Sequence, residues 1–163
     1  ALKVVCIIIP ILIIGGMIFL SLIYNDGNAI LYKLNDVLNN RLGFGKYGFV
    51  EYGLSPWGKL IEMQGLGRTE GGIENLWNTG LSYFVLDCSY VNILLQFGVV
   101  LFCVLVILQF VGVIQNYQAD CLFILIIYIV ICIQCAVEHH YLEIAYNPLL
   151  FFSMSKYGKS NNK

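Results

Sequence analysis

The sequence predicts an all-α membrane protein: a polytopic set of about four transmembrane helices with one large extracytoplasmic loop that contains an amphipathic helix. Two observations predict this class. Of the 163 residues, 59% are hydrophobic and only 12% are charged, whereas soluble domains are about 45–50% apolar and about 25% charged. Long uncharged runs also recur along the chain, and runs of that length are typical of membrane-spanning helices.

Four apolar segments are the expected spans. The first, at residues 4–24, contains no charged residue; as a helix it would be about 31 Å long, which matches a hydrocarbon core of about 30 Å. The second and third are expected at residues 94–114 and 121–137. The fourth, at residues 144–155, is short and contains Asn147-Pro148. It is therefore either a thin span or a re-entrant segment that packs against its neighbours.

Both ends of the chain are expected on the cytoplasmic side. Lys3 precedes the first span and three lysines follow the fourth, within residues 156–163; positive residues beside short loops favour the cytoplasm. Residues 25–87 would then form the outer loop. We therefore expect a multi-pass protein of the cell membrane, in which residues 1–163 are a single membrane region and the C-terminal fragment of a longer polytopic protein.

An amphipathic helix is expected at Asn28–Leu42, near the start of the outer loop. Its apolar residues recur with a period close to 3.6, and its opposite face carries Lys33, Asp36 and Arg41. A helix with this pattern is expected to rest on the membrane surface or on the transmembrane helices.

Two glycine patterns in the outer loop imitate nucleotide-binding motifs. Gly43-x-Gly45-x-x-Gly48 has the spacing of a dinucleotide fingerprint, but it follows a predicted helix rather than a strand. Gly53–Lys59 resembles most of a P-loop, but Leu60 stands where Ser or Thr would ligate Mg²⁺. We expect no nucleotide site, and we interpret these glycines as part of a flexible loop.

Arginine, carboxylate and imidazole side chains near the predicted outer ends of the spans are the candidate site. Arg41 and Arg68 carry planar guanidinium groups, which suit bidentate binding of phosphate or carboxylate. The other candidates lie just before the second span and just after the third; they are Asp87, Glu138, His139, His140 and Glu143. The predicted topology faces both groups outward, where they could converge.

Ordinary structural roles remain open for these candidates. Asp87 could be a helix N-cap, since Asp is favoured there, and the two histidines could simply be solvated at the interface. Adjacent histidines on a helix point in different directions, and Cys132-x-x-Cys135 lies in an apolar span without a second ligand pair. We therefore expect no metal and no cofactor. No basic run is present, so we also expect no nucleic-acid partner.

Three sequence blocks together carry a family resemblance. They are N-x-R-L at Asn39–Leu42 with a downstream G-L-S-P-W-G loop, L-D-C-S-Y-V-N-I-L-L-Q-F-G at Leu86–Gly98, and E-H-H-Y-L-E-I-A-Y-N-P-L-L at Glu138–Leu150. The chain, from about residue 30 to 154, resembles the C-terminal portion of Wzy-type polysaccharide polymerases. These proteins make capsules, exopolysaccharides and O antigens. The second block, which enters a predicted membrane helix, is the most specific.

The resemblance implies a membrane glycosyltransferase that joins polyprenyl-pyrophosphate-linked oligosaccharides at the outer face of the cytoplasmic membrane. Besides the lipid bilayer, its potential partners would be a flippase and a chain-length regulator. Arg41 and Arg68 would stabilise the leaving pyrophosphate. A general base for the acceptor hydroxyl would come from the candidates Asp87, Glu138, His139 and His140. Some members of the family have an R-x10-G pattern, but eleven residues separate Arg41 from Gly53, so Arg41 rests on the N-x-R-L pattern instead.

Three other functions remain open. An O-antigen ligase would transfer the glycan to a lipid core, although residues 25–87 contain none of the histidines expected in a ligase loop. A polysaccharide flippase or transporter fragment would act without catalysis. Transport favours polar residues near the middle of broken helices, and the centres of the first and third spans are almost purely apolar. The third is a non-catalytic membrane subunit.

Overall fold

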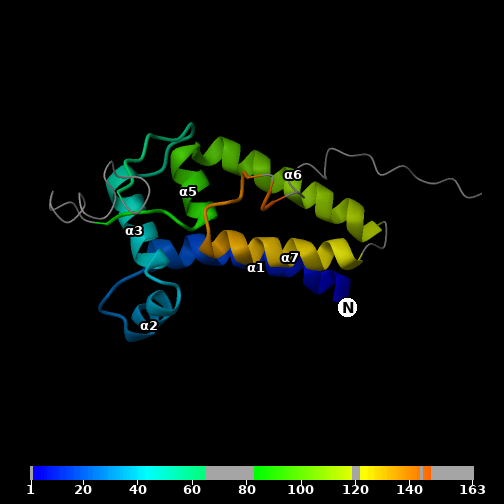
Figure 1. Cartoon of the computed structure of the whole chain (residues 1–163), viewed down its shortest axis with the longest axis horizontal. Helices are drawn as coiled ribbons and strands as arrows, with labels where there is room; N and C mark the ends of the chain where they lie inside the picture. Colours follow the sequence, from blue (N-terminus) through cyan, green and yellow to red (C-terminus); the bar gives the residue numbers. More distant parts are fainter. Residues whose placement is uncertain (1, 65–82, 119–121, 144, 148–163) are drawn as a thin grey trace, which may run out of the picture.

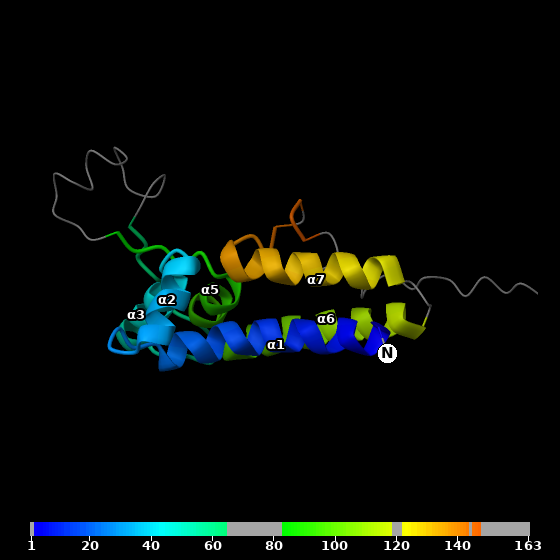
Figure 2. The ribbon, with the colours of Figure 1, turned by 90° about the horizontal axis from the view of Figure 1, so that it is seen from below.

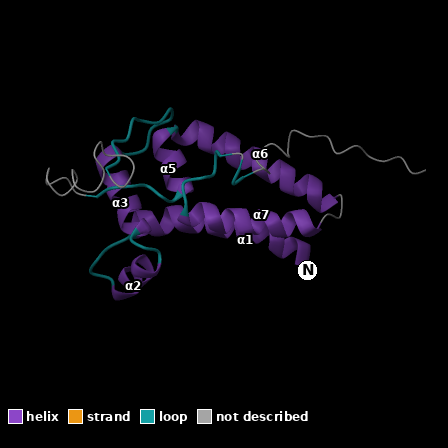
Figure 3. Ribbon diagram, viewed as in Figure 1, coloured by secondary structure: helices purple, strands orange, loops and turns teal. Residues whose placement is uncertain are grey.

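The computed structural model describes residues 2–64, 83–118, 122–143 and 145–147. In these residues the fold is helical, which confirms the predicted all-α class for this part of the chain (Figures 1 and 3). The helices are α1 (Leu2–Ile23), α2 (Ala29–Val37), α3 (Arg41–Tyr52), α5 (Ser89–Gln96), α6 (Gly98–Gln118) and α7 (Leu122–Val137).

Three long apolar helices run lengthwise beside one another, and three shorter helices gather at one end of them. Figures 1 and 2 show α1, α6 and α7 along the long axis, with α2, α3 and α5 at the end far from the N-terminus. α1 packs against α7 and α3, while α6 packs against α5 and α7. The short helices therefore gather at one end of the long helices, which we call the short-helix end.

One helix of the described chain is long and apolar enough to cross a membrane. It is α6, in which the window Gly98–Gln115 has a mean hydropathy of 2.5 and is only 22% buried inside the structure. Ile7–Ile23 in α1 and Phe123–Val137 in α7 are shorter apolar segments. Large apolar side chains on the outward faces of these helices are more than half exposed; examples are Leu12, Phe19, Ile107, Phe123 and Val130.

The predicted spans correspond to these helices with two differences. The second predicted span, residues 94–114, begins too early, because the chain bends at Gly98 with φ +89° and separates α5 from α6. The fourth, residues 144–155, lies outside the described residues except for Ala145–Asn147, which form a turn. In that turn the backbone N–H groups of Tyr146 and Asn147 both donate to the carbonyl of Glu143.

The single amphipathic helix predicted at residues 28–42 is wrong, because the chain forms α2 and α3 with a reversal between them. Asn28 caps α2, since its Oδ1 accepts the N–H of Ile30 at 3.0 Å. Asn39 and Asn40 then adopt left-handed backbone conformations, with φ 48° and 62°. Asparagine tolerates this conformation better than most residues. The helical period continues through the reversal, which is why it did not indicate the break.

The flexible loop predicted at Gly43–Gly48 is also wrong, because these residues lie inside α3. A Cβ on Gly45 would lie 2.6 Å from Ser21 Oγ of α1, and a Cβ on Gly48 would lie 2.9 Å from a methyl carbon of Leu95 in α5. The glycines therefore let α3 approach both neighbours closely. This packing positions the start of α3, where Arg41 lies.

The segment that imitates a P-loop caps the start of α6. The carbonyls of Ser55 and Pro56 accept the N–H groups of Val99 and Val100 at 3.0 and 3.1 Å, which are donors that the first turn of a helix leaves unpaired. The backbone of this segment lies very close to the end of α5, since a Cβ on Gly58 would lie 2.1 Å from the carbonyl oxygen of Gln96. Gly58 therefore allows close backbone packing at the start of α6.

Candidate functional site

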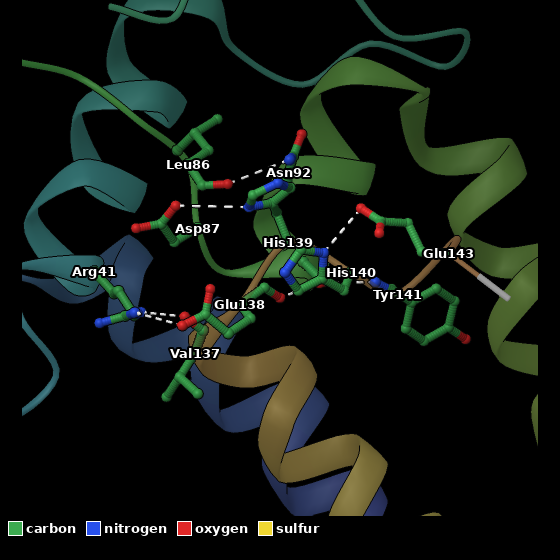
Figure 4. Close-up of polar contacts among 11 residues, drawn as sticks. Arg41, Leu86, Asp87, Asn92, Val137, Glu138, His139, His140, Tyr141 and Glu143 are labelled. Atoms are coloured by element: carbon green, nitrogen blue, oxygen red, sulfur yellow. Dashed lines mark hydrogen bonds and ion pairs between the residues drawn. The ribbon is translucent and has the colours of Figure 1, made fainter. Parts of the chain in front are cut away.

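Segments that are far apart in the sequence meet at the short-helix end of the long helices. Figure 4 shows Arg41 at the start of α3, Asp87 just before α5, and residues 138–143 just after α7 around one region. The structure therefore brings together Asp87 and the residues that follow α7, as the sequence predicted, and adds Arg41 to them. Arg68 lies outside the described residues, so the structure does not place it.

Arg41 is largely buried and is held from α7. Its Nε donates to the Val137 carbonyl at 2.5 Å and its Nη1 donates to the Leu38 carbonyl at 3.0 Å. Nη2 lies 3.6 Å from Glu138 Oε1, and the Arg41 side chain is only 11% exposed. Arginine thereby satisfies a carbonyl at the C-terminal end of α7, where a positive charge is also favourable.

Asp87 and His139 face each other across the site. His139 Nδ1 lies 3.7 Å from Asp87 Oδ1, and both side chains are about three-tenths exposed. This separation is too long for a hydrogen bond, and His139 Nδ1 is buried without a hydrogen-bond partner among the described residues. The N-cap of α5 is Cys88 and not Asp87. Asp87 therefore does not serve as the helix N-cap that the sequence suggested.

His140 has a different carboxylate partner. Its Nδ1 lies 2.8 Å from Glu143 Oε1, and its ring stacks on Tyr146 with centroids 4.1 Å apart. The rings of His139 and His140 lie 4.6 Å apart at their centroids. The site thus contains two imidazoles side by side, each with a carboxylate near its Nδ1 atom.

A buried network of polar side chains holds the turn that carries these histidines. The Ser89 hydroxyl donates to the Glu138 carbonyl, and Ser89 Oγ accepts the N–H of Tyr141 at 3.2 Å. Asn147 Nδ2 donates to the Tyr141 carbonyl at 2.9 Å. Sequence reasoning missed Ser89, Tyr141 and Asn147 as site residues, although Ser89 lies two positions after Asp87 and Asn147 lies in the third resemblance block.

Buried titratable groups beside the site remain neutral. Burial raises the pKa of the Cys88 thiol to about 11, so this cysteine is not a thiolate nucleophile near neutral pH. Burial also raises the pKa of Tyr141, and its neutral hydroxyl donates to Gln109 Oε1 in α6. The other ionisable groups of the site are the carboxylates, the imidazoles and Arg41.

Glu138, His139 and His140 are the described residues that could hold a metal ion. One ligand atom from each lies within 4.8 Å of the others. The expectation that adjacent histidines would diverge on a helix does not apply, because α7 ends at Val137. Glu138 faces Arg41, however, so a cation would compete with the guanidinium for this carboxylate. Cys132 and Cys135 are free thiols buried among the helices, consistent with the packing role considered for them.

Comparison of the chain with protein-family models, with curated proteins and with solved structures gives no match.

Proposed function

We propose that this protein is a multi-pass membrane glycosyltransferase that polymerises polyprenyl-pyrophosphate-linked oligosaccharides at the outer face of the cytoplasmic membrane. The observation that carries the proposal is the meeting of Arg41, Asp87 and His139 at one end of the long apolar helices (Figure 4). This arrangement combines a cation for a leaving diphosphate with a base for an attacking hydroxyl. The three described apolar helices and the proposed fourth segment at residues 144–155 anchor it in the bilayer.

In the proposed transfer, a hydroxyl of the acceptor sugar attacks the anomeric carbon of the donor glycan. A new glycosidic C–O bond forms, and the C–O bond to the pyrophosphate breaks. The polyprenyl pyrophosphate leaves with the bonding electron pair, while the acceptor hydroxyl gives its proton to the enzyme. The protein must therefore stabilise developing negative charge and accept one proton.

Arg41 is the proposed electrostatic group, together with Arg68 of the outer loop. Two of its donors already bind backbone carbonyls, so the side chain is held in place before the substrate arrives. Its Nη2 faces Glu138, whose side chain is 45% exposed and lies at 3.6 Å. A diphosphate oxygen can displace this exposed carboxylate, and Glu138 holds Arg41 until it does.

His139 is the proposed general base, and Asp87 is the proposed positioning residue behind it. A neutral imidazole with its proton on Nδ1, facing Asp87 Oδ1, has Nε2 available to accept the hydroxyl proton. The carboxylate then stabilises the imidazolium that forms. His140, which Glu143 and Tyr146 hold, packs beside His139 and orients its ring.

The test replaces His139 with Gln and Asp87 with Asn in the full-length protein, and measures polymer formation from lipid-linked repeats in isolated membranes. General-base catalysis contributes about 10²–10⁴-fold, so we expect His139→Gln to reduce the rate at least 100-fold and Asp87→Asn to reduce it less. His140→Gln should retain more activity than His139→Gln. The reverse order, or full activity in His139→Gln, would refute the assignment of the base.

Deletion of the gene separates the proposed function from its alternatives. Loss of a polymerase leaves single repeats on the carrier, and loss of a ligase leaves long polymer on the carrier. Loss of a flippase traps repeats on the inner leaflet. We expect the first pattern, and either of the others would replace polymerisation with ligase or transport function.

A further inference from the structure

We propose that the cavity between the end of α1, α2 and α3 binds a neutral saccharide segment. This inference rests on the proposed function, because the cavity would then hold the glycan whose end reacts at Arg41 and His139. The cavity has a volume of about 970 Å³, and residues 83–84 complete its described wall. That volume is at the upper end of the range for small-molecule sites, about 300–1,000 Å³.

Exposed aromatic rings from three segments line this cavity. Tyr32 of α2 is 58% exposed, Tyr47 of α3 is 50% exposed and Tyr83 is 43% exposed. Aromatic neighbours support two of these rings: Tyr47 packs edge-on against the buried Phe84 at 4.8 Å, and Tyr83 packs near the half-buried Phe44 at 5.7 Å. Large rigid faces with an apolar body and a hydroxyl at the tip suit ligands with alternating C–H faces and hydroxyl groups.

Polar side chains with unused hydrogen-bonding capacity line the same cavity. Asp26 Oδ1 accepts the Tyr24 hydroxyl at 2.5 Å, and Asn25 Oδ1 accepts the N–H of Gly27 at 2.9 Å. A carboxylate has a second oxygen and an amide has two further donors. Asp26 can therefore accept from ligand hydroxyls, and Asn25 can donate to them.

One buried asparagine fixes the shape of the cavity. Asn35 is 4% exposed; its Nδ2 donates to the Tyr24 hydroxyl and to Asn40 Oδ1, both at 3.0 Å. Its Oδ1 accepts the N–H of Gly43 at 2.9 Å. α1, α2 and α3 are thus joined through this one side chain, and the wall residue Asn40 directly precedes Arg41.

Charge and polarity disfavour other ligands. Lys46 is the single Lys or Arg among the described residues that line the cavity, and its Nζ already donates to the Leu22 carbonyl at 2.7 Å. Asp26 on the same wall offsets the charge of Lys46, so the described lining offers an anionic ligand such as a phosphate no net positive charge. A lipid tail would cover the second carboxylate oxygen of Asp26 and the NH2 group of Asn25 without offering them partners, which is unfavourable. A neutral, hydroxyl-rich ligand fits the remaining requirements.

The test places the photo-crosslinking residue p-benzoylphenylalanine at position 47 in living cells of the source organism. The matched control carries it at position 57, because Trp57 is an aromatic residue that is 80% exposed and does not line the cavity. After irradiation, the purified protein is digested and the adduct is identified by mass spectrometry. We expect a sugar-bearing adduct at position 47 and none at position 57.

Each other outcome counts against the inference. An adduct with phospholipid or polypeptide at position 47, no adduct there, or equal glycan capture at both positions would overturn it. A second measurement uses isolated membranes: Tyr47→Ala should raise KM for lipid-linked repeats about tenfold with little change in kcat, whereas Tyr47→Phe should resemble the wild type. Unchanged KM in Tyr47→Ala would also overturn the inference.

The two measurements also distinguish failure of the cavity assignment from failure of the proposed polymerase function. A sugar-bearing adduct at position 47 in a protein that forms no polymer would retain the cavity assignment and remove the polymerase. Polymer formation without capture at position 47, and without a KM effect, would retain the polymerase and remove the cavity assignment.

Discussion

Arg41 combines a structural role with the proposed catalytic one. Its Nε and Nη1 bind the carbonyls of Val137 and Leu38, while its Nη2 faces Glu138. Only a planar guanidinium can bond in these three directions at once, since a lysine ammonium is a compact point charge on a flexible stem. The same rigidity that fixes α3 against α7 also holds a positive charge at the place where we propose that the diphosphate binds.

We therefore expect Arg41→Lys to be a severe substitution. It keeps the charge but leaves the partly buried Val137 carbonyl without its Nε donor, which costs about 1–3 kcal/mol. It also lowers the rate of polymer formation about 100-fold because the electrostatic group is misplaced. Thermal unfolding in detergent and gel analysis of polymer length measure the two effects. Lys33→Ala, which removes an exposed cation of α2, is the control and should change neither. Wild-type chain length in Arg41→Lys would contradict the electrostatic role.

The sequence indicates the charged candidates for the site, while it does not indicate the residues that hold them. Asp87 and His139 are candidates because they flank predicted spans, and Arg41 is a candidate because a guanidinium suits phosphate binding. The supporting bonds from Ser89 reach residues 49 and 52 positions away, and no local pattern indicates which hydroxyl will meet which backbone group. The Asp87–His139 pairing likewise depends on how α5 and α7 pack.

At the scale of helices, small residues decide how closely α3 approaches its neighbours. Gly45 faces Ser21 of α1 without room for a Cβ, and Ser21 is fully buried. The sequence predicted that these glycines formed a flexible loop because glycine is common there. Tertiary packing overrode this tendency, since the close crossing of α1 and α3 compensates for the low helix propensity of glycine.

Gly45→Ala is expected to separate α1 from α3. The new methyl group overlaps Ser21 Oγ and Cβ, and overpacking of this kind costs about 1–3 kcal/mol, so the unfolding temperature and the transfer rate should both fall. Gly15→Ala is the matched control in α1, where a Cβ meets nothing within 4 Å, and it should be neutral or slightly stabilising.

The double variant Ser21→Gly/Gly45→Ala tests whether the overlap is the cause. Ser21→Gly removes both atoms that the new methyl group meets, so the double variant should unfold at a higher temperature than Gly45→Ala alone. Additive losses in the two single variants would show that the contact is not responsible.

At the scale of the molecule, the outward faces of the long helices differ from a soluble surface. α6 is mostly unburied along its apolar window, and large apolar side chains project outward from α1 and α7 as well. Contiguous apolar surface of this extent indicates a membrane or a protein partner. Composition alone predicts a membrane environment, because that prediction needs only the number of charged residues and the length of the uncharged runs.

The last prediction concerns which ends of the helices face the outside. Leu60 is 90% exposed and follows the segment that caps the start of α6, whereas Gln115 is exposed near the other end of that helix. If α6 spans the bilayer with the proposed site outside, a membrane-impermeant thiol reagent should label Leu60→Cys in intact cells and Gln115→Cys only after lysis. Both variants are made in a chain whose own cysteines are replaced by alanine.

Labelling of Gln115→Cys alone in intact cells would place the arginine and histidine cluster in the cytoplasm, away from lipid-linked repeats on the outer leaflet. Equal labelling of both positions would show that α6 does not cross the membrane.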